Sequence, residues 1–253
     1  MVDNFYTKKE LAKYLTSIIK EKCKYKLALE PSAGDGSFSN LINCIAIDID
    51  PKNKNIIKQD FLTFDKSFKD LLVFGNPPFG KRSNLAKKFI KKSIKIGANY
   101  IAFILPSTFE KLNNQIVFPN DWKLIFKEKI PKDSFEKEGK TFDIPCIFYI
   151  WTNMDSKINL REENIKYKTD DFIFLQRGDN KADFVINGNN GKIKKLIEVS
   201  NPKAEHYIKC LKDKENVINN FNKVKYTFFS SISGKNAWIN QQEIIKEYIN
   251  STS

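Results

Sequence analysis

Short apolar runs separated by helical stretches constrain the fold of this 253-residue chain more than any other feature. Each run spans only a few residues and is followed by proline, glycine or an acidic residue, which is typical of buried strands. Strands that alternate with helices pack as a parallel sheet covered on both faces. The pattern therefore predicts an α/β fold with strands at Lys26–Leu29, Cys44–Ile47, Leu71–Phe74 and Tyr100–Leu105, and a strand end at Gln59–Phe61.

Helical periodicity is clearest near the N-terminus. Leucine and isoleucine recur at helical spacing over residues 8–22, where Thr7 is placed as the N-cap and Glu10 as the second half of a capping box. Asp50 followed by Pro51 has the form of another N-cap. Further helices are predicted over residues 38–43 and 85–94.

The last two apolar runs of this region have no helix between them. Residues 122–130 and 142–151 both have strand character, and the polar residues 132–140 join them as a loop. Strands joined without a crossover helix pair antiparallel. We therefore expect a mostly parallel, seven-stranded sheet with an antiparallel hairpin at one edge.

Composition changes after about residue 153, where asparagine and lysine become frequent and periodicity weakens. We predict one domain over residues 1–153 and a small α+β domain over residues 154–253. Within the second, residues 170–175 and 182–186 are candidate strands and residues 239–248 a candidate helix. The polar loop Ser230–Lys235 is a weak candidate for a nucleic-acid contact.

Several classes of protein are disfavoured by residue content. The four cysteines are far apart, which argues against a zinc site and a disulfide framework. His206 is the single histidine, so a Ser-His-Asp triad is not expected, and we interpret it as a structural residue or a phosphate contact. No apolar run approaches the length of a membrane helix, and no secretory signal is evident. We expect a cytoplasmic, metal-free protein with no membrane association.

Positive charge is concentrated in one segment. The net charge is +13, and residues 51–100 hold 12 basic and 3 acidic residues, a balance of +9. A cationic surface of this kind suits a polyanion such as nucleic acid. The nucleic-acid-binding residues that we predict are Lys81, Arg82, Lys87, Lys88 and Lys91.

The tetrapeptide Asn76-Pro77-Pro78-Phe79 directly follows the apolar run Leu71–Gly75. Two consecutive prolines cannot continue a central strand or enter a helix interior, so this segment is a stiff turn at a strand end. It presents an amide side chain, backbone carbonyls and an aromatic ring. This set suits an exocyclic amino group on a flat ring, although a strand-ending turn without function has the same sequence.

A glycine-containing loop and acidic strand ends accompany this turn. Glu30-Pro31-Ser32-Ala33-Gly34-Asp35-Gly36 lies between a strand and a predicted helix. Its glycines permit close approach of a ligand, and the helix N-terminus favours polar or negative groups. Asp48 and Asp60 end two further strands. Ligands of open α/β sheets bind at the carboxyl ends of the strands, where an acidic side chain can accept hydrogen bonds from ribose hydroxyls. We therefore favour ribose binding for Asp48 and helix capping for Asp50.

Taken together, these motifs resemble those of S-adenosylmethionine-dependent N6-adenine DNA methyltransferases, and in particular compact microbial and phage-type members. The resemblance covers about residues 5–151 in the gamma-like motif order. It departs from the family at Lys8, where many relatives have proline. It rests on Phe5-Tyr6-Thr7, Glu30–Gly36, Ala46–Pro51, Asp60-Phe61, Asn76–Phe79, Ile104–Phe109 and Phe142–Cys146.

The resemblance implies a Rossmann-like methyltransferase fold, S-adenosylmethionine as cofactor with S-adenosylhomocysteine as product, and a C-terminal target-recognition region. Asn76 and Pro77 would accept both N6 hydrogens of a flipped adenine, and Phe79 would stack on it. Thr7 would contact the methionine carboxylate, Asp48 the ribose and Asp60 the cofactor adenine. The implied catalytic residues are Asn76, Pro77, Pro78 and Phe79. The implied cofactor-binding residues are Tyr6, Thr7, Glu30, Pro31, Ser32, Ala33, Gly34, Gly36, Asp48, Ile49, Asp60, Phe61 and Asn76.

Three alternatives stay open at this point. The same turn serves RNA adenine methyltransferases, and a protein glutamine N5-methyltransferase shares the chemistry of a planar amide nitrogen. A catalytically silent member could bind nucleic acid as a subunit. The basic segment after residue 80 argues against a protein substrate, and the intact Asn76–Phe79 turn argues against a silent protein. The recognition sequence, a homodimer and a restriction or other partner subunit are not determined by the sequence.

Overall fold

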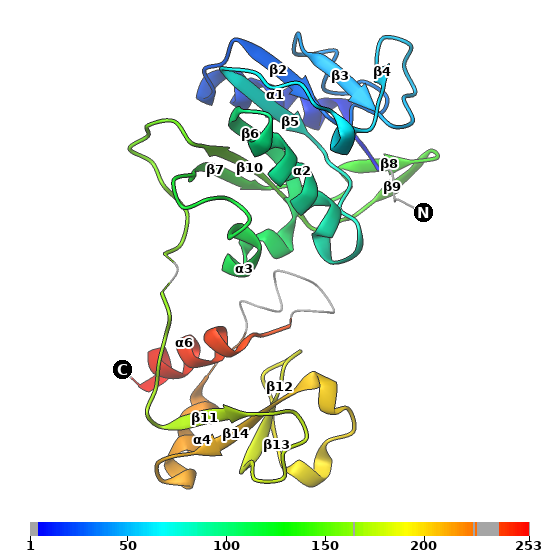
Figure 1. The fold of residues 1–253 in the computed structure, drawn as a ribbon. Helices are drawn as coiled ribbons and strands as arrows, with labels where there is room; N and C mark the ends of the chain where they lie inside the picture. The colour runs from blue at the N-terminus through cyan, green and yellow to red at the C-terminus, as the bar shows by residue number, and fades with distance from the viewer. Residues whose placement is uncertain (1–4, 164, 225, 227–237, 253) are drawn as a thin grey trace. The chain divides into compact units, whose positions relative to one another are not determined.

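The computed structural model describes residues 5–163, 165–224, 226 and 238–252, and of Arg82 only the backbone. The chain divides into two compact units, residues 1–162 and residues 163–253 (Figure 1). This division falls nine residues after the predicted boundary, because the intervening segment still packs on the first unit. Within it, the Leu160 N–H donates to Leu124 O at 2.7 Å.

A seven-stranded sheet forms the centre of the first unit, in the order β4-β3-β2-β5-β6-β10-β7. Neighbours from β4 to β6 run parallel, whereas β10 runs antiparallel to both β6 and β7. The predicted fold class, a mostly parallel sheet with an antiparallel pair at one edge, is confirmed. The strands are β2 (Leu27–Glu30), β3 (Ile45–Asp48), β4 (Ile57–Lys58), β5 (Leu71–Gly75), β6 (Ala98–Pro106), β7 (Lys123–Lys129) and β10 (Cys146–Thr152).

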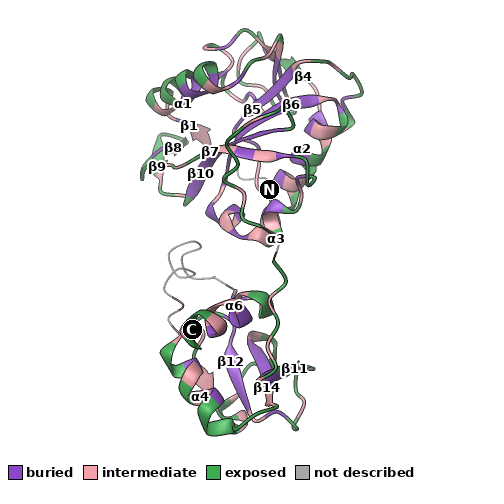
Figure 2. Ribbon diagram, turned by 90° about the vertical axis from the view of Figure 1, so that its left-hand side faces the viewer, coloured by how far each residue is buried: buried purple, intermediate pink, exposed green. Residues whose placement is uncertain are grey.

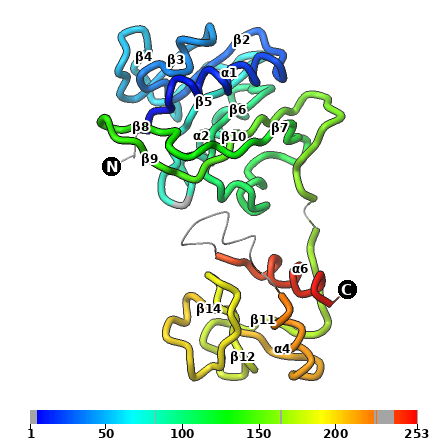
Figure 3. Tube along the Cα trace, turned by 180° about the vertical axis from the view of Figure 1, so that it is seen from behind, coloured from blue at the N-terminus to red at the C-terminus, as the bar shows by residue number. Residues whose placement is uncertain are grey.

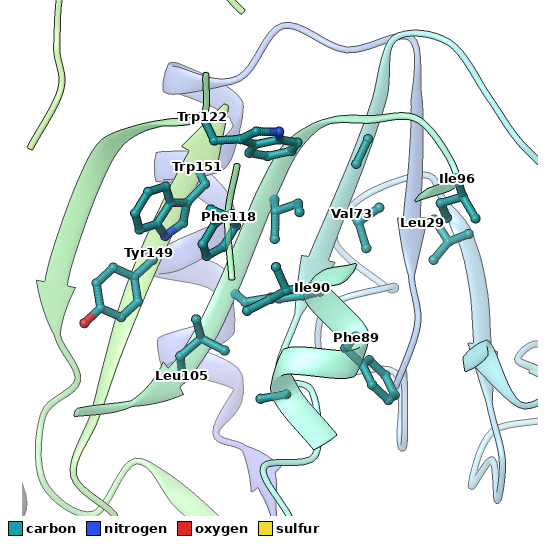
Figure 4. Packing of buried hydrophobic residues seen from close by; sticks show 14 of the residues in the cluster. Leu29, Val73, Phe89, Ile90, Ile96, Leu105, Phe118, Trp122, Tyr149 and Trp151 are labelled. Carbon is teal, nitrogen blue, oxygen red and sulfur yellow. The ribbon is translucent and has the colours of Figure 1, made fainter. Parts of the chain in front are cut away.

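The buried strands send alternate side chains to opposite faces, and each face has its own apolar core. Leu71 and Val73 face the cluster that includes helix α2 (Asn84–Lys95), part of which appears in Figure 4. Leu72 and Phe74 face the cluster that includes helix α1 (Lys9–Lys22). The view from behind in Figure 3 has α1 in front of the sheet. Both faces are therefore covered, as continuous apolar strands require.

A small three-stranded sheet lies beside the large one in the same unit. It consists of β1 (Tyr6–Thr7), β8 (Phe135–Lys137) and β9 (Lys140–Phe142), in the order β1-β8-β9. The prediction of a loop over residues 132–140 is therefore wrong. Glu138 and Gly139 have φ of 52° and 73°, and positive φ at both turn residues matches the twist of a tight hairpin. The hairpin fixes the N-terminal segment, because β1 pairs with β8.

The second unit is a four-stranded antiparallel sheet, in the order β11-β14-β12-β13, packed against two helices. Its strands β12 and β14 are largely buried (Figure 2). The predicted strands and final helix of this region correspond to β11, β12 and α6, whereas β13, β14 and α4 were not predicted. Residues 230–235 lie outside the described residues. The elements are β11 (Phe172–Leu175), β12 (Phe184–Asn187), β13 (Ile193–Lys194), β14 (Glu205–Cys210), α4 (Lys214–Lys223) and α6 (Gln241–Thr252).

Short helices connect the larger elements of both units. They are α3 (Leu112–Gln115) and the 3-10 turns η1 (Phe61–Thr63), η2 (Lys81–Ser83), η3 (Ser107–Glu110), η4 (Leu196–Glu198) and η5 (Pro202–Ala204).

Three local predictions are wrong. Thr7 does not cap α1, because it belongs to β1, and the N-cap position is held by Lys8 without a side-chain hydrogen bond. Residues 38–43 form turns instead of a helix. Here the Asp35 carboxylate accepts from both the N–H and the hydroxyl of Ser37, and such local bonds compete with helix. Asp50 caps no helix, and its carboxylate pairs with Lys52.

Candidate functional site at the carboxyl ends of the parallel strands

Three adjacent parallel strands bring the predicted site residues together. β3, β2 and β5 are neighbours, and their carboxyl ends carry Asp48, Glu30 and Asn76 respectively. The glycine that precedes Asn76 lies against Glu30, since a Cβ at Gly75 would come within 3.1 Å of Glu30 Cγ. Residues far apart in sequence thus converge at one end of the sheet.

The loop after β2 is held closely against both neighbouring strands. The Gly34 N–H donates to Asp48 Oδ2 at 2.8 Å, and the Ser32 hydroxyl donates to the Asn76 carbonyl oxygen at 3.1 Å. Gly34 has a φ of 53°, and a Cβ there would meet the Tyr6 ring at 2.9 Å. Both the backbone conformation and the packing of Tyr6 therefore require glycine.

Asp48 accepts a backbone N–H at each carboxylate oxygen. Oδ2 accepts from Gly34, and Oδ1 accepts from the Asp50 N–H at 2.8 Å. Each carboxylate oxygen has a second lone pair, so the fixed side chain can still accept from a ligand. The next side chain, Ile49, is 66% exposed, which leaves an apolar surface beside the carboxylate.

Asp60 follows β4 and is half-buried. Its Oδ1 accepts the Leu62 N–H at 2.8 Å, which caps η1. The backbone N–H of the preceding Gln59 donates to the Asp48 carbonyl oxygen at 2.8 Å, so the two acidic residues belong to one connected segment of the site. The second carboxylate oxygen of Asp60 has no partner among the described residues.

The amide of Asn76 is fixed by the N-terminal segment. Its Nδ2 donates to Thr7 Oγ1 at 3.3 Å and to the Phe5 carbonyl oxygen at 3.4 Å. Because the NH₂ group is engaged on that side, Oδ1 points away from it, and no donor within the described residues reaches Oδ1. Thr7 accepts this bond through its oxygen and retains its own O–H as a donor.

The remaining residues of the turn attach it to α2. The Phe79 carbonyl oxygen accepts from the Leu85 and Ala86 N–H groups at 3.1 and 3.3 Å, at the start of that helix. The Phe79 ring is half-buried against the cluster that contains α1. Pro77 is buried, and no described donor reaches its carbonyl oxygen. Among the described residues no donor reaches the Pro78 carbonyl oxygen either, so the turn holds several free acceptors, of which Asn76 Oδ1 and the Pro77 carbonyl oxygen belong to adjacent residues.

Glu30 differs from the other acidic site residues because it is 2% exposed. Burial raises the pKa of this carboxyl well above its usual range, although a hydrogen bond with Ser39 opposes the shift. Its Oε2 has no hydrogen-bond partner in the part of the chain that the structure describes. A protonated carboxyl at the floor of the site is the state that this environment favours.

Phe61 does not reach the site. Its ring is 1% exposed and packs at 5.1 Å from Phe89 of α2 and 6.4 Å from Phe64. The Phe61 side chain is therefore not exposed for the expected contact with a cofactor ring. The sequence placed an aromatic residue directly after Asp60, but the 3-10 turn η1 directs it into the core.

The lysines of α2 lie on the helix face opposite its core contacts. Lys88 and Lys91 are exposed and Lys87 is half-buried, and Lys81 of the preceding turn η2 is exposed as well. Burial and the neighbouring Lys91 charge lower the pKa of Lys87. Among the described residues, no acidic side chain pairs with these lysines, and the side chain of Arg82 is outside them. The cationic surface starts directly after the Asn76–Phe79 turn.

A cavity of about 220 Å³ opens beside the loop after β2. The predicted residues Tyr6 and Thr7 line it, but so does Glu136 of β8, which the sequence did not single out. No sequence signal could have placed Glu136 there, because only the β1–β8 pairing brings it to residue 6. The other lining residues are Lys8, Lys9, Glu10, Asp35 and Ser37.

The described residues contain no group of three or more histidine, cysteine, aspartate or glutamate side chains placed to hold a metal ion. No helix among them combines the length and apolar character needed to cross a membrane.

Comparison with known proteins finds likeness in structure and none in sequence. No family model and no curated protein matches the chain. An N-methyltransferase, NodS, from Bradyrhizobium japonicum aligns with 58% of this chain and 96% of its own, at 13% identity and a TM-score of 0.42. A tRNA methyltransferase from M. jannaschii covers 58% of this chain and 49% of its own, at 19% identity and a TM-score of 0.41.

A third solved structure has a similar score. The magnesium protoporphyrin IX methyltransferase of Synechocystis covers 57% of this chain and 78% of its own, at 9% identity and a TM-score of 0.42. No residue role follows from likeness at this level, so the roles below rest on the contacts of the site itself.

Proposed function

We propose that this protein transfers a methyl group from S-adenosylmethionine to the N6 amino group of adenine in DNA. The observation that carries the proposal is a pair of adjacent acceptors in the turn after β5 that no donor of the described residues reaches. Asn76 Oδ1 and the Pro77 carbonyl oxygen belong to adjacent residues of a stiff turn, and an exocyclic amino group has two hydrogens to donate.

These acceptors are suited to the chemistry of an aromatic amine. The N6 lone pair of adenine is delocalised into the ring, so the nitrogen is a poor nucleophile. Two fixed acceptors favour a more tetrahedral nitrogen, whose lone pair can then point at a methyl donor. Because Thr7 and Phe5 already hold the Asn76 amide, little reorganisation is needed when the base binds.

The other side of the site fits the proposed cofactor. S-adenosylmethionine, when bound, supplies a methyl group activated on a sulfonium. Asp48 is oriented to accept from ribose hydroxyls, Ile49 offers an apolar surface to a flat ring, and Asp60 has one carboxylate oxygen left to accept from an amino group. The free O–H of Thr7 can donate to a carboxylate.

A nucleic-acid substrate, which we propose to be DNA, is supported by the cationic side chains that follow the turn and that pair with no acidic side chain of the described residues. Lys88 and Lys91 can hold backbone phosphates while the target base occupies the turn. An adenine in a duplex must first leave the helix, at a cost of a few kcal/mol, and stacking on Phe79 would offset part of that cost.

The test is methyl transfer by the full chain from cofactor labelled on the methyl group. Duplex DNA, single-stranded DNA and RNA are offered in parallel, and the modified base is identified after digestion. We expect N6-methyladenine in DNA, and for Asn76→Ala a loss of at least about 100-fold in turnover while cofactor binding is kept. Asn250→Ala serves as the control, because Asn250 is exposed on α6.

Each other outcome has a defined meaning. Label in RNA alone would show that RNA, and not DNA, is the substrate. Label on glutamine of an added protein would show that the methyl acceptor is a protein amide and not a base. Turnover of Asn76→Ala close to that of the unaltered protein would contradict the proposed role of the Asn76 amide as an acceptor.

A further inference from the structure

The β8–β9 hairpin of the first unit starts beside the Asn76–Phe79 turn. β8 pairs with β1, and Thr7 of β1 accepts from the Asn76 amide at 3.3 Å. The Lys8 N–H also donates to the Ser134 carbonyl oxygen at 3.0 Å, which fixes the base of the hairpin to the N-terminal segment. Figures 1 and 3 both draw the hairpin extending to one side of the large sheet. An anchored projection thus begins at residues that contact the proposed site.

Only the base of the hairpin is packed against the rest of the unit. Phe135 is buried, and Phe142, its partner in register, is half-buried with its ring 5.0 Å from the Phe5 ring. The turn residues Glu138 and Gly139 are exposed, and a Cβ at Gly139 would meet no atom within 4 Å. At the usual rise of a strand, the turn lies about 10 Å beyond the buried base. The tip is therefore open to a large ligand.

The turn contains a residue that its backbone conformation disfavours. Glu138 has a φ of 52° and Gly139 a φ of 73°. Tight hairpins with positive φ at both turn residues favour Asn-Gly or Asp-Gly, because longer side chains are strained at the first position. Residues held in sparsely populated backbone conformations gather at functional sites. Glu138 is therefore a candidate for a role beyond forming the turn.

Two exposed side chains at the tip have no partner. Neither the Glu138 carboxylate nor the Lys140 ammonium makes a hydrogen bond or ion pair among the described residues. Nearer the base, Glu136 instead lies 4.0 Å from the Lys8 ammonium. The tip thus presents one acceptor group and one donor group with no net charge. It adds little to the attraction of a polyanion, but it can distinguish donors from acceptors on a ligand.

We propose that the tip of the β8–β9 hairpin reads base edges in the major groove of the DNA, beside the adenine that is methylated. The inference rests on the proposed function, because it takes DNA as the ligand. The major groove admits a two-stranded β-ribbon and is about 8.5 Å deep, so a hairpin of about 10 Å reaches its floor. Glu138 accepts from a cytosine N4 amino group, and Lys140 donates to guanine O6 or N7. The recognition sequence should therefore contain a G·C pair.

This role separates specificity from affinity. The α2 lysines would contact phosphates, which are the same in every sequence. The Glu138 carboxylate, in contrast, is repelled by phosphates and by keto oxygens, so it stabilises only a complex that places an amino group in front of it. Glu138→Ala should therefore bind random-sequence duplexes at least as tightly as the unaltered protein does, while losing preference for its own sequence.

The test selects duplexes from a random-sequence library. The full chain is mixed with the library and an excess of S-adenosylhomocysteine, and the bound duplexes are sequenced. We expect an enriched sequence with a G·C pair. In Glu138→Ala and in Lys140→Gln, enrichment at that pair should fall by at least about 5-fold while other positions are kept. Lys132→Gln is the control, because Lys132 is exposed ahead of β8 and should alter no position.

Glu138→Asn separates a role in base reading from a role in folding. Asparagine suits the turn, so the midpoint of urea unfolding should stay the same or rise. Asparagine pairs with adenine in the major groove, so the preference at this position should move from G·C toward A·T. A residue that only formed the turn would show the change in unfolding midpoint and no change in sequence preference.

The proposal is overturned if every hairpin variant enriches the same sequence as the unaltered protein, or if the unaltered protein enriches none. A sequence preference that changes in Arg177→Gln but not in the hairpin variants would also overturn it, by placing recognition in the second unit. Absence of methyl transfer together with a preference that depends on Glu138 would contradict the proposed function alone and leave the reading of DNA by the hairpin in place.

Discussion

Two arginine–tryptophan pairs, one in each unit, have nearly the same spacing and different surroundings. Arg161 lies 5.6 Å from the Trp151 ring and Arg177 lies 5.7 Å from the Trp238 ring. The Arg161 guanidinium also donates to four carbonyl oxygens of the segment 115–122, at 2.6 to 3.4 Å. Arg177 makes no such bond among the described residues. The hydrogen bonds of Arg161 hold the segment 115–122 in place, whereas the Arg177 guanidinium stays exposed.

The same distinction separates polar groups throughout the molecule. Asp48 and Asn76 are held by several hydrogen bonds, so their remaining acceptors are fixed in direction before any ligand arrives. Glu30 is only partly bonded, and within the described part of the chain no acidic side chain pairs with the α2 lysines. Polar groups that are held orient a ligand, whereas free charges mainly attract one.

The largest expected effect is on stability and tests the two arginines directly. Arg161→Ala should lower the free energy of unfolding of the first unit by about 2–3 kcal/mol, because charged hydrogen bonds to carbonyls are lost and the carbonyls stay unpaired. Arg177→Ala should change the stability of the second unit by less than about 0.5 kcal/mol. Urea unfolding of the full chain, followed by far-ultraviolet circular dichroism and by tryptophan fluorescence, measures both. Equal changes in the free energy of unfolding for the two variants would contradict the different roles inferred for the two arginines.

Asp48→Ala should weaken binding of S-adenosylmethionine by about 10- to 100-fold. The ribose loses its acceptor, and the Gly34 and Asp50 N–H groups lose the carboxylate that orders the loop. Calorimetric titration with the cofactor measures the change, and turnover at saturating cofactor should largely recover. Asp65→Ala is the matched control, since Asp65 is an exposed residue of the segment after η1. An unchanged affinity would contradict the ribose role.

Glu30→Gln should alter how stability depends on pH. The raised pKa of Glu30 means that the folded protein keeps a proton that the unfolded chain releases above a pH of about 4.3. Stability of the unaltered protein therefore falls as pH rises from there toward the folded pKa, by up to about 1.4 kcal/mol per pH unit. The glutamine variant lacks this loss, so its advantage should be greater at pH 8 than at pH 5. Urea unfolding at the two pH values checks it, and parallel curves would refute it.

The smallest effect is expected from the free lysines. The double variant Lys88→Gln, Lys91→Gln should bind duplex DNA a few-fold more weakly at moderate salt and reduce the salt slope by about 1.8, or 0.9 for each phosphate contact. Lys13→Gln, Lys20→Gln is the control, because those exposed lysines lie on α1, across the sheet from α2. Fluorescence anisotropy over a salt series decides between them, and identical slopes for the two double variants would reject the α2 surface.

Local sequence signals predicted the large sheet well and its surroundings less well. The central strands consist almost entirely of apolar residues, which are stable only when buried. For this reason β2, β3, β5 and β6 lie close to their predicted positions. The hairpin β8–β9 was missed because its residues are mostly polar, and only pairing with β1 gives them strand structure. The strand β14 begins with Glu205 and His206, and these polar residues do not indicate a buried strand in the sequence. Its burial results from the elements that pack around it.

For individual site residues too, the local sequence pattern and the observed contacts can differ. Thr7 has the sequence of a helix cap, but its hydroxyl oxygen accepts from Asn76, 69 residues away. Phe61 was placed at the site by its position after Asp60, yet its ring is buried against α2. A local pattern specifies what a residue can do, and the partners that decide between its options are distant in sequence.

The sequence by itself determined the alternation of strands and helices, the stiff turn at Asn76–Phe79 and the excess of positive charge after it. These depend on backbone restriction, apolar periodicity and composition, which act between near neighbours. Only the tertiary structure decided which way the Asn76 amide faces, which carboxylates are buried and which arginine is left free. Those properties depend on hydrogen bonds and desolvation between distant segments, which come into existence when the chain folds.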